Sequence, residues 1–258
     1  MRIASWNVNS IRARLHALTQ WLDDQQPDVL LLQETKVVDE EFPSDDLTRR
    51  GYSVVFAGQK SYNGVAILSQ LPIKDVTIGF PGDPQSADKR LISASIAGIR
   101  VSSGYIPNGK DIANPAFQEK LAWLTRLRDF LALERTKYGL PIAIGGDFNV
   151  AREGRDVYSP ELFEGQLHFH PDERRKMDEL LAIGLTDTFR LFVQEAARYS
   201  WWDYRGTAYA KNRGLRIDYV FVDEPLVPRC RAADIDIAPR QWEKPSDHVP
   251  VWVEIADK

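Results

Sequence analysis

The feature that most constrains this chain is the apolar run from Pro141 to Gly146, which ends in a turn carrying Asp147 and Asn149. A short, continuous apolar run of this kind predicts a strand that is buried on both faces. Because residues two apart on a strand share a face, Asp147 and Asn149 are expected to point into one cleft if the extended geometry continues through the turn. The alternative is turn chemistry alone, since Gly, Asp and Asn are common turn formers.

Two apolar segments near the beginning of the chain end in a similar way. Residues Arg2 to Val8 predict a strand, Ser10 predicts the N-cap of the helix that follows, and Val29 to Leu32 predict a second buried strand. Polar side chains lie at the ends of both strands, and they belong to Asn7, Asn9, Glu34 and Lys36. Their shared placement predicts that they meet at one edge of the fold.

The middle of the chain predicts short strands followed by a long helix. Residues 52–57, 64–69 and 75–80 are expected to form an antiparallel meander. The segments 91–97 and 99–105 surround Gly98 and are expected to form a hairpin, whose second arm leads to Tyr105 and Asn108. Apolar residues at helical spacing predict a helix from Pro115 to Tyr138, which Gly139 ends.

The last part of the chain mixes loops, one helix and further strands. Residues 152–165 are rich in charge, Pro and Gly and predict a long surface loop, and a helix is expected to begin at Pro171 and to end before Gly184. Strands are expected at 199–204, 216–222, 235–237 and 249–255. Three more polar residues accompany these strands, namely Asp218, Asp247 and His248.

This order of elements predicts a single domain over residues 1–258. Two mainly antiparallel or mixed sheets, packed face to face with helices outside, form an α/β sandwich that accounts for it, and a loose internal repetition of strand, polar turn and helix favours two similar halves. A doubly wound dinucleotide-binding fold is the weaker alternative, because no glycine-rich fingerprint follows a strand.

Composition limits the environment and the partners of the chain. One cysteine, Cys230, excludes a disulfide framework and a cysteine-rich zinc site, and favours a reducing compartment. No signal peptide or membrane-spanning run is expected, so a cytoplasmic location is predicted and no membrane partner. The 33 Lys and Arg against 37 Asp and Glu, a net charge of -4, argue against passive nucleic-acid binding but leave a local basic surface possible.

The polar residues at the strand ends form a set with a recognisable chemistry: Asn7, Glu34, Tyr105, Asn108, Asp147, Asn149, Asp218, Asp247 and His248. Oxygen donors with one imidazole suit Mg²⁺, or Mn²⁺ as a substitute, better than zinc. Such a site indicates a phosphate ester as substrate. Taken singly, each residue has an ordinary explanation: Glu34 can be a solvated strand end, and Asp218 can pair with Arg216.

An ordered series of motifs resembles the exodeoxyribonuclease III family of abasic-site endonucleases. The series comprises Ser5-Trp-Asn7-Val-Asn9, Leu32-Gln-Glu34-Thr-Lys36, Asn63-Gly-Val-Ala-Ile67, Gly104-Tyr-Ile-Pro-Asn108, Gly146-Asp-Phe-Asn149, Tyr199-Ser-Trp-Trp-Asp-Tyr204, Asn212-Arg-Gly-Leu-Arg-Ile-Asp218 and Lys244-Pro-Ser-Asp-His248. The resemblance implies a four-layered α/β sandwich and a magnesium-dependent enzyme. It further implies an enzyme that cuts double-stranded DNA on the 5′ side of abasic sites, trims 3′ ends, and acts as a monomer near the nucleoid.

The resemblance also implies roles for individual residues. Asp147 is expected to activate the attacking water and Asn149 to orient it, while Asp218 and His248 polarise the scissile phosphate. Tyr105 is expected to contact the phosphate and has a leaving-group role in the family. Metal ligation is implied for Glu34 with Asn7 and Asp247 nearby, and substrate contacts are implied for Asn108, Asn9 and Lys36.

Lesion recognition is expected to involve Trp201 and Leu215, which match the family's pocket wall and wedge. The alternative is that Trp201 and its neighbour Trp202 belong to the core. A DNA-facing rim is expected from Lys211, Arg213 and Arg216 with Arg174, Arg175 and Lys176. His168 lies where smaller residues also occur in the family, and it is expected either to narrow the lesion pocket or to be an ordinary surface histidine.

Two other functions fit the same fold. One is a nucleic-acid-binding regulator with an inactive site, but the complete acidic set argues against it. The other is a phosphatase of the wider superfamily that acts on inositol phosphates or lipids, and the segments around Trp201 and Leu215 favour DNA instead.

Overall fold

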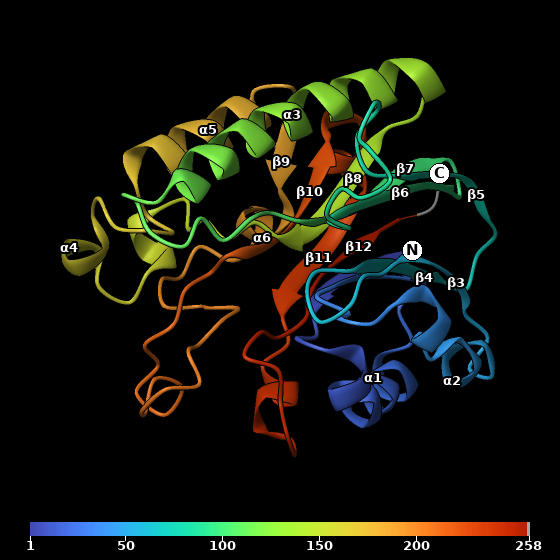
Figure 1. The fold of residues 1–258 in the computed structure, drawn as a ribbon, viewed down its shortest axis with the longest axis horizontal. Helices are drawn as coiled ribbons and strands as arrows, with labels where there is room; N and C mark the ends of the chain where they lie inside the picture. Colours follow the sequence, from blue (N-terminus) through green and yellow to red (C-terminus); the bar gives the residue numbers. More distant parts are fainter. Residues whose placement is uncertain (257–258) are drawn as a thin grey trace.

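The computed structural model describes residues 1–256 as two six-stranded sheets packed face to face (Figure 1). The first sheet has the order β11 (Cys230–Ile235), β12 (Val251–Ile255), β1 (Arg2–Asn7), β2 (Val29–Gln33), β4 (Val65–Ser69) and β3 (Ser53–Ala57). The second has the order β5 (Ile73–Ile78), β6 (Leu91–Ile96), β7 (Ile99–Tyr105), β8 (Ile142–Asp147), β10 (Asp218–Asp223) and β9 (Leu185–Asp187).

Helices cover the outer faces of both sheets (Figure 1). On the first sheet lie α1 (Ile11–Gln25) and α2 (Ser44–Thr48), and on the second lie α3 (Pro115–Tyr138) and α5 (Pro171–Leu181). Shorter elements complete the chain: α4 (Pro160–Phe163), α6 (Thr188–Phe192), and the 3₁₀ turns η1 (Asp39–Glu41), η2 (Gly154–Asp156), η3 (Glu224–Arg229) and η4 (Ala238–Gln241). The predicted four-layered α/β sandwich is confirmed.

Each sheet contains one parallel pair of strands at its centre. In the first sheet β1 runs parallel to β2, with Asn7 opposite Gln33. In the second sheet β7 runs parallel to β8, with Tyr105 opposite Asp147. Because the carboxyl ends of parallel strands meet at one edge of a sheet, each sheet delivers two strand ends to the same place. The antiparallel partner β10 adds its first residue, Asp218, opposite Asp147.

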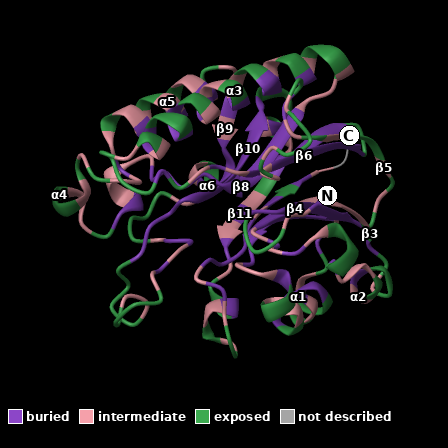
Figure 2. Cartoon of the chain, in the orientation of Figure 1, coloured by how far each residue is buried: buried purple, intermediate pink, exposed green. Residues whose placement is uncertain are grey.

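Alternation along the strands explains the three hydrophobic layers. In β1, Ile3 belongs to the cluster between the two sheets, whereas Ala4 and Trp6 belong to the cluster under α1. In β8, Ala143 faces the inter-sheet layer, whereas Ile144 faces α3 and α5. The central strands are therefore buried on both faces, whereas the edge strand β5 and the outer helices and loops carry exposed residues (Figure 2).

The predicted helix boundaries are confirmed by their caps. Ser10 caps α1 by accepting a hydrogen bond from the Ala13 amide. Asn114 caps α3, Pro115 occupies its first turn, and Gly139 ends it with a left-handed φ of 60°. These residues satisfy backbone groups that a helix terminus leaves without partners. Among residues 1–256, no helix combines the length and the apolar character needed to cross a membrane.

Several predicted strands are wrong in their partners or bounds. The meander is divided, because β3 and β4 pair in the first sheet whereas β5 crosses to the second and pairs with β6. Residues 199–204 form isolated bridges instead of a strand, because the backbone pairs only at Trp201, with Leu215 and His248. The strand expected at 235–237 is β11, which ends at Ile235. The loop 152–165 contains two short helical turns.

Glycine lets the two sheets approach closely near the strand ends. A Cβ atom added at Gly145 would lie 2.8 Å from Leu31 Cδ1 and 3.0 Å from Ser5 Cβ, both in the opposite sheet. These separations are too short for ordinary van der Waals contact, so a side chain at Gly145 would force the sheets apart. The residues after Gly145 are thereby brought close to those after Ser5.

Candidate active site

Asn7 joins carboxylates from the two sheets. Its side-chain Nδ2 donates to Glu34 Oε1 at 2.8 Å and to Asp147 Oδ2 at 2.9 Å. Asn7 is the last residue of β1 and Asp147 is the last residue of β8, while Glu34 directly follows β2. A neutral donor between two carboxylates reduces the repulsion that would otherwise separate them. The predicted convergence of these strand ends is therefore observed.

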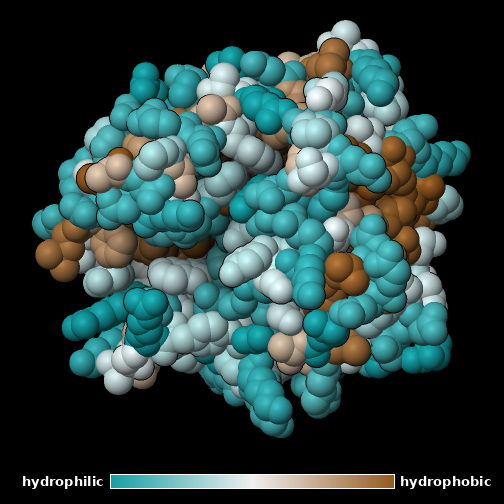
Figure 3. Space-filling view, in the orientation of Figure 1, coloured by the Kyte–Doolittle hydropathy of each residue, from teal (hydrophilic) through white to brown (hydrophobic). Residues whose placement is uncertain are grey.

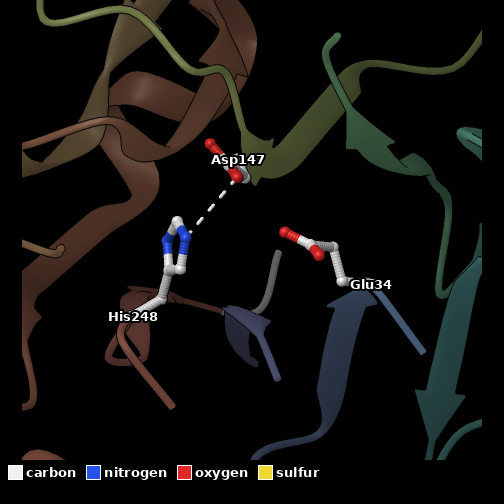
Figure 4. Close-up of side chains that lie close together, drawn as sticks. All are labelled: Glu34, Asp147 and His248. Atoms are coloured by element: carbon white, nitrogen blue, oxygen red, sulfur yellow. Dashed lines mark ion pairs between the residues drawn. The ribbon is translucent and has the colours of Figure 1, made fainter. Parts of the chain in front are cut away.

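Glu34, Asp147 and His248 form a compact cluster (Figure 4). One ligand atom from each lies within 4.8 Å of the others. The oxygen atoms of Glu34 and Asp147 fit a hard divalent cation such as Mg²⁺. The His248 imidazole faces carboxylates on both nitrogens, Asp218 through Nδ1 and Asp147 through Nε2, so both nitrogens already have partners. The structure thus supports a metal site built from Glu34 with oxygen neighbours, without identifying the metal.

The environment of Asp147 raises its pKa to about 7. Burial is the largest cause, since only 1% of the residue is exposed and the charged form is disfavoured away from water. The positive charge of His248 opposes this effect, whereas the carboxylates of Asp218 and Glu34 add to it. A carboxyl group with a pKa near neutral pH can accept a proton efficiently, as a general base requires.

His248 and Asp218 form a buried ion pair. His248 Nδ1 lies 2.9 Å from Asp218 Oδ2, and His248 Nε2 lies 3.7 Å from Asp147 Oδ2. Burial lowers the pKa of His248, but the facing carboxylates of Asp218 and Asp147 outweigh burial and raise it to about 10. His248 is therefore a stable imidazolium that can stabilise negative charge. Sequence reasoning missed Ser200, whose Oγ donates to Asp218 Oδ2 at 2.7 Å and holds the carboxylate in place.

Asn149 reaches Asp147 through a turn. Its φ of 53° shows that the extended geometry does not continue past Asp147, so that part of the prediction is wrong. The two residues nevertheless meet, because the Asn149 amide N–H donates to Asp147 Oδ1 at 2.9 Å and its Nδ2 lies 3.3 Å from Asp147 Oδ2. Asn108 Nδ2 donates to Asn149 Oδ1 at 3.2 Å. Two amides therefore lie beside the candidate base.

Tyr105 lies beside the same carboxylates. Burial raises the pKa of its phenol far above the usual value, and the negative charges of Glu34 and Asp147 raise it further. The hydroxyl therefore remains protonated and acts as a hydrogen-bond donor. Arg90 stacks over the other side of the ring, with its guanidinium carbon 4.7 Å from the ring centroid.

Asp247 lies outside the carboxylate cluster around Glu34. Its two oxygens accept hydrogen bonds from Asn9 Nδ2 at 2.9 Å and from Trp201 Nε1 at 3.0 Å. Burial raises the pKa of Asp247, but the His248 charge and these hydrogen bonds outweigh it and lower the pKa. Lys36 connects the two regions, because its Nζ contacts Glu34 Oε2 and Asn9 Oδ1, both at 2.6 Å.

Arg216 does not lie on a DNA-facing rim, and this prediction is wrong. Only 1% of Arg216 is exposed, and its guanidinium forms ion pairs with Asp156 at 2.8 Å and with Asp187 at 2.8 Å. The expected alternative, a pair between Arg216 and Asp218, is also wrong. The physical reason is that the loop 152–165, predicted to lie on the surface, turns Asp156 inward. The other predicted rim residues are exposed or half-buried.

Leu215 and Trp201 differ in exposure. Leu215 is 1% exposed and packs in a cluster with Val157, Phe169 and Ile217, so it is not an exposed wedge in the free protein, and its role in lesion recognition stays a prediction. Trp201 is half-buried and packs against that cluster, which agrees with a pocket wall. Trp202 is the core aromatic of the pair.

His168 is a half-buried loop residue beside Trp201, and its effect on the lesion pocket stays a prediction. The two ring centroids are 6.4 Å apart, and His168 Nδ1 lies 2.7 Å from the carbonyl oxygen of Asn149. Burial and then the positive charge of Lys120 lower the pKa of His168 to about 3. The ring is therefore neutral, with Nδ1 as the donor and Nε2 left as an acceptor.

Two facing sheets with a carboxylate and imidazolium cluster at their strand ends define a hydrolase of phosphate esters. Residues 4–248 match the Endonuclease/Exonuclease/phosphatase family. Exodeoxyribonuclease III of Haemophilus influenzae is 38% identical over 266 residues, which cover 98% of this chain and 99% of that protein. DNA repair nuclease APEX1 of Danio rerio is 31% identical, with 99% of this chain and 82% of that protein covered.

Solved structures agree with the sequence matches. The 3′-5′ exonuclease NExo of Neisseria meningitidis has a TM-score of 0.96 and 38% identity, with both chains fully covered. An AP endonuclease from Archaeoglobus fulgidus has a TM-score of 0.94 and 41% identity, with 99% of each chain covered. The chain therefore belongs to the exonuclease III and AP endonuclease family, whose members are DNA-repair nucleases.

Proposed function

We propose that residues 1–258 act as one catalytic domain, a magnesium-dependent DNA phosphodiesterase in which Mn²⁺ can substitute. It cleaves duplex DNA on the 5′ side of abasic sites and removes nucleotides or blocking groups from 3′ ends. We further propose that it works as a monomer on chromosomal DNA in the cytoplasm. The observation that carries this proposal is Asp147, buried between Asn7, Asn149 and His248 with a pKa raised to about 7.

The residues divide the reaction among them. Asp147 accepts a proton from a water molecule that Asn149 orients, and the water oxygen attacks phosphorus opposite the leaving 3′ oxygen. The P–O3′ bond breaks, and the departing 3′ oxygen takes a proton from solvent water to become a 3′ hydroxyl, while the phosphate stays on the other fragment. Asp147 then returns the proton it accepted to solvent. The His248 imidazolium, held by Asp218, faces the phosphate oxygens on which charge accumulates.

Two further groups stabilise the phosphate. Tyr105, which stays protonated, donates to a phosphate or leaving oxygen, and Asn108 supplies a neutral donor. Glu34 with Asn7 would hold Mg²⁺, which when bound supplies a Lewis acid that neutralises charge on the phosphate and the leaving oxygen. Lys36 and Asn9 lie next to these residues and extend the polar surface towards Asp247.

Similarity to DNA-acting proteins supports the choice of substrate. The 3′ phosphatase NExo from Neisseria has been solved with a product DNA hairpin, and it has a TM-score of 0.96 to this chain. The face seen in Figure 3 is mainly hydrophilic, with hydrophobic side chains gathered mostly at its right edge, near β5 in Figure 1. Hydrophilic surface of this kind suits contact with the DNA backbone.

His168 governs the balance between the two activities in this proposal. The relatives include a 3′-5′ exonuclease and an AP endonuclease on the same fold. The His168 imidazole stands against the Trp201 wall and narrows the space for an extruded abasic sugar, which favours 3′-end processing. Because His168 has a φ of 71°, His168→Gly also suits the backbone, and it should raise the ratio of abasic incision to 3′-end trimming. An unchanged ratio would count against this role, and His16→Ala on the exposed face of α1 is the control.

One assay tests the main proposal. The purified protein is incubated with an abasic duplex, a recessed 3′ end, a 3′-phosphate end and a phosphoinositide, each with Mg²⁺ and with EDTA. We expect metal-dependent cleavage of the DNA substrates only. Turnover of the phosphoinositide alone, or DNA binding without cleavage, would overturn the proposal.

A further inference from the structure

A fully buried ion pair lies directly beneath the site. Lys120 of α3 and Glu173 of α5 each have a side chain with 0% exposure, and they contact each other through Nζ and Oε1. The ammonium group has two more acceptors, the carbonyl oxygens of Asn149 at 2.7 Å and Asn108 at 3.2 Å. The three N–H groups of Lys120 are therefore matched by three acceptors. The second oxygen of Glu173 accepts from the His170 amide N–H, which fixes the start of α5.

The two carbonyl groups belong to the loops that carry the active-site amides. Asn108 follows β7 and Asn149 follows β8, and their side chains are hydrogen-bonded to each other. A Cβ added at Gly109 would lie 3.2 Å from Lys120 Cδ, so the aliphatic stem of Lys120 packs under the first loop. One cation thus joins both loops from the side of α3.

A purely structural brace between α3 and α5 would not need these charges. Apolar residues of similar volume can replace a buried ion pair with little or no loss of stability. The choice of acceptors is what points to function, because both belong to the backbone of residues assigned to the phosphate and the water. A second buried pair on the same helix provides a comparison.

Arg100 and Glu134 are also buried, with side-chain exposures of 0% and 2%. Glu134 is on α3 like Lys120, whereas Arg100 lies near the beginning of β7, at the opposite end from Tyr105. The other acceptors of Arg100 belong to residues of β5 and β6 and are remote from the strand ends. This pair matches the first in burial and in kind of interaction but has no contact with the site.

We propose that Lys120 and Glu173 are positioning residues that hold the Asn108 and Asn149 amides in place for the chemical step. The inference rests on the proposed function, since it assigns a role within that reaction. Neither residue touches the substrate. Loss of the pair is therefore expected to lower the rate of cleavage without weakening the binding of DNA.

The test compares two double variants. Lys120→Met/Glu173→Leu removes both charges, so that no unpaired charge is left buried, and Arg100→Met/Glu134→Leu does the same at the remote pair. Single-turnover cleavage of a 3′-recessed duplex is measured with saturating protein, DNA affinity is measured in EDTA, and Tm is recorded. Because small misplacements of catalytic groups cost on the order of 100-fold in rate, we expect the first variant to be about 100-fold slower.

The expected pattern separates positioning from stability. DNA affinity of the first variant should stay within about 3-fold of the wild type, and the remote variant should keep its rate within about 3-fold at a comparable loss of Tm. Equal rates in the two variants, or a loss confined to affinity, would overturn the inference. If wild-type protein cleaves no DNA, the proposed function itself fails, which is a different result.

A milder variant covers the case in which the double variant does not fold. Glu173→Gln is nearly isosteric and keeps an acceptor for Lys120, but it removes the negative charge and can no longer accept from the His170 amide on its second side. We expect a folded protein with about a 10-fold lower single-turnover rate and unchanged DNA affinity. A wild-type rate in Glu173→Gln would overturn the inference.

Discussion

The two sheets supply the site with the same arrangement of strands but at different depths. Each has a central parallel pair, which delivers Asn7 and Glu34 from the first sheet and Tyr105 and Asp147 from the second. The Glu34 side chain is 14% exposed, whereas that of Asp147 is 2% exposed. An open carboxylate suits a cation that exchanges with solvent, and a closed carboxylate suits a base with a raised pKa. The depth of the two carboxylates therefore matches the two roles that we propose for them.

The largest effect is expected from removing the carboxylate of Asp147, the proposed base. Asp147→Asn should reduce cleavage by about 1,000-fold or more, since general base catalysis contributes up to ~10⁴-fold. The protein should remain folded with an unchanged or higher Tm, because the buried charge is unfavourable to stability. Steady-state rates and thermal melts measure both effects. Near-native turnover by a correctly folded variant would remove Asp147 from the mechanism.

A smaller effect on activity is expected from a change at Glu34, the more exposed of the two carboxylates. Glu34→Gln should raise the Mg²⁺ concentration for half-maximal activity by about 10-fold to 100-fold, while activity at saturating Mg²⁺ falls less than in Asp147→Asn. Magnesium titrations of the cleavage rate give this concentration directly. Glu41→Gln, an exposed residue paired with Arg12, is the control that should leave the titration unchanged. An identical Mg²⁺ requirement in Glu34→Gln would assign the metal to other residues.

The buried groups His248 and Asp147 also predict that the stability of the protein depends on pH. The pKa of His248 rises from 6.5 to about 10 on folding, so its contribution is complete below pH 6.5 and is lost as the pH rises through about 10. The pKa of Asp147 is likewise higher in the folded protein, about 7, so stability also declines as the pH rises from 3.8 through that value. Urea unfolding in EDTA should show stability falling between pH 6.5 and 10. His248→Asn should flatten that decline, and parallel curves would contradict the assignment.

The smallest effect, a change in the salt dependence of DNA binding, should come from charged residues outside the cluster at the strand ends. Arg213→Ala removes one exposed charge, and if Arg213 contacts a phosphate the slope of log affinity against log salt should fall by about 1. Arg216→Gln, which removes the charge, should leave that slope unchanged and lower Tm instead, because Arg216 is buried and the change breaks its ion pairs with Asp156 and Asp187. Binding isotherms at several salt concentrations distinguish the two. A reduced slope for Arg216→Gln would show that Arg216 contacts the DNA backbone.

Local sequence patterns predicted which residues lie at the strand ends. The partners of the buried charged residues depend on contacts between distant parts of the chain and could not be predicted in this way. Asp147 could be placed from its own strand because an apolar run and a turn are short-range signals. Arg216 could not, since its burial depends on Asp156, 60 residues away. Lys120 did leave a signal, because it lies on the apolar stripe with Phe117, Leu121 and Leu124, where a charge demands a buried partner. The sequence does not say which residue pairs with Lys120 or which carbonyl groups accept its hydrogen bonds. Those contacts depend on how α3 and α5 pack together.

Because the two sheets approach closely at Gly145, the geometry of the active site depends on the packing of the core between them. Since Glu34 and Asp147 come from opposite sheets, the distance between them depends on how closely the two sheets pack at that end. A substitution that slightly widens the space between the sheets would leave each sheet intact. It would move Glu34 and Asp147 out of their relative positions. Gly145→Ala is such a change, and we expect it to slow cleavage and to lower Tm together, because overpacking a core also costs stability.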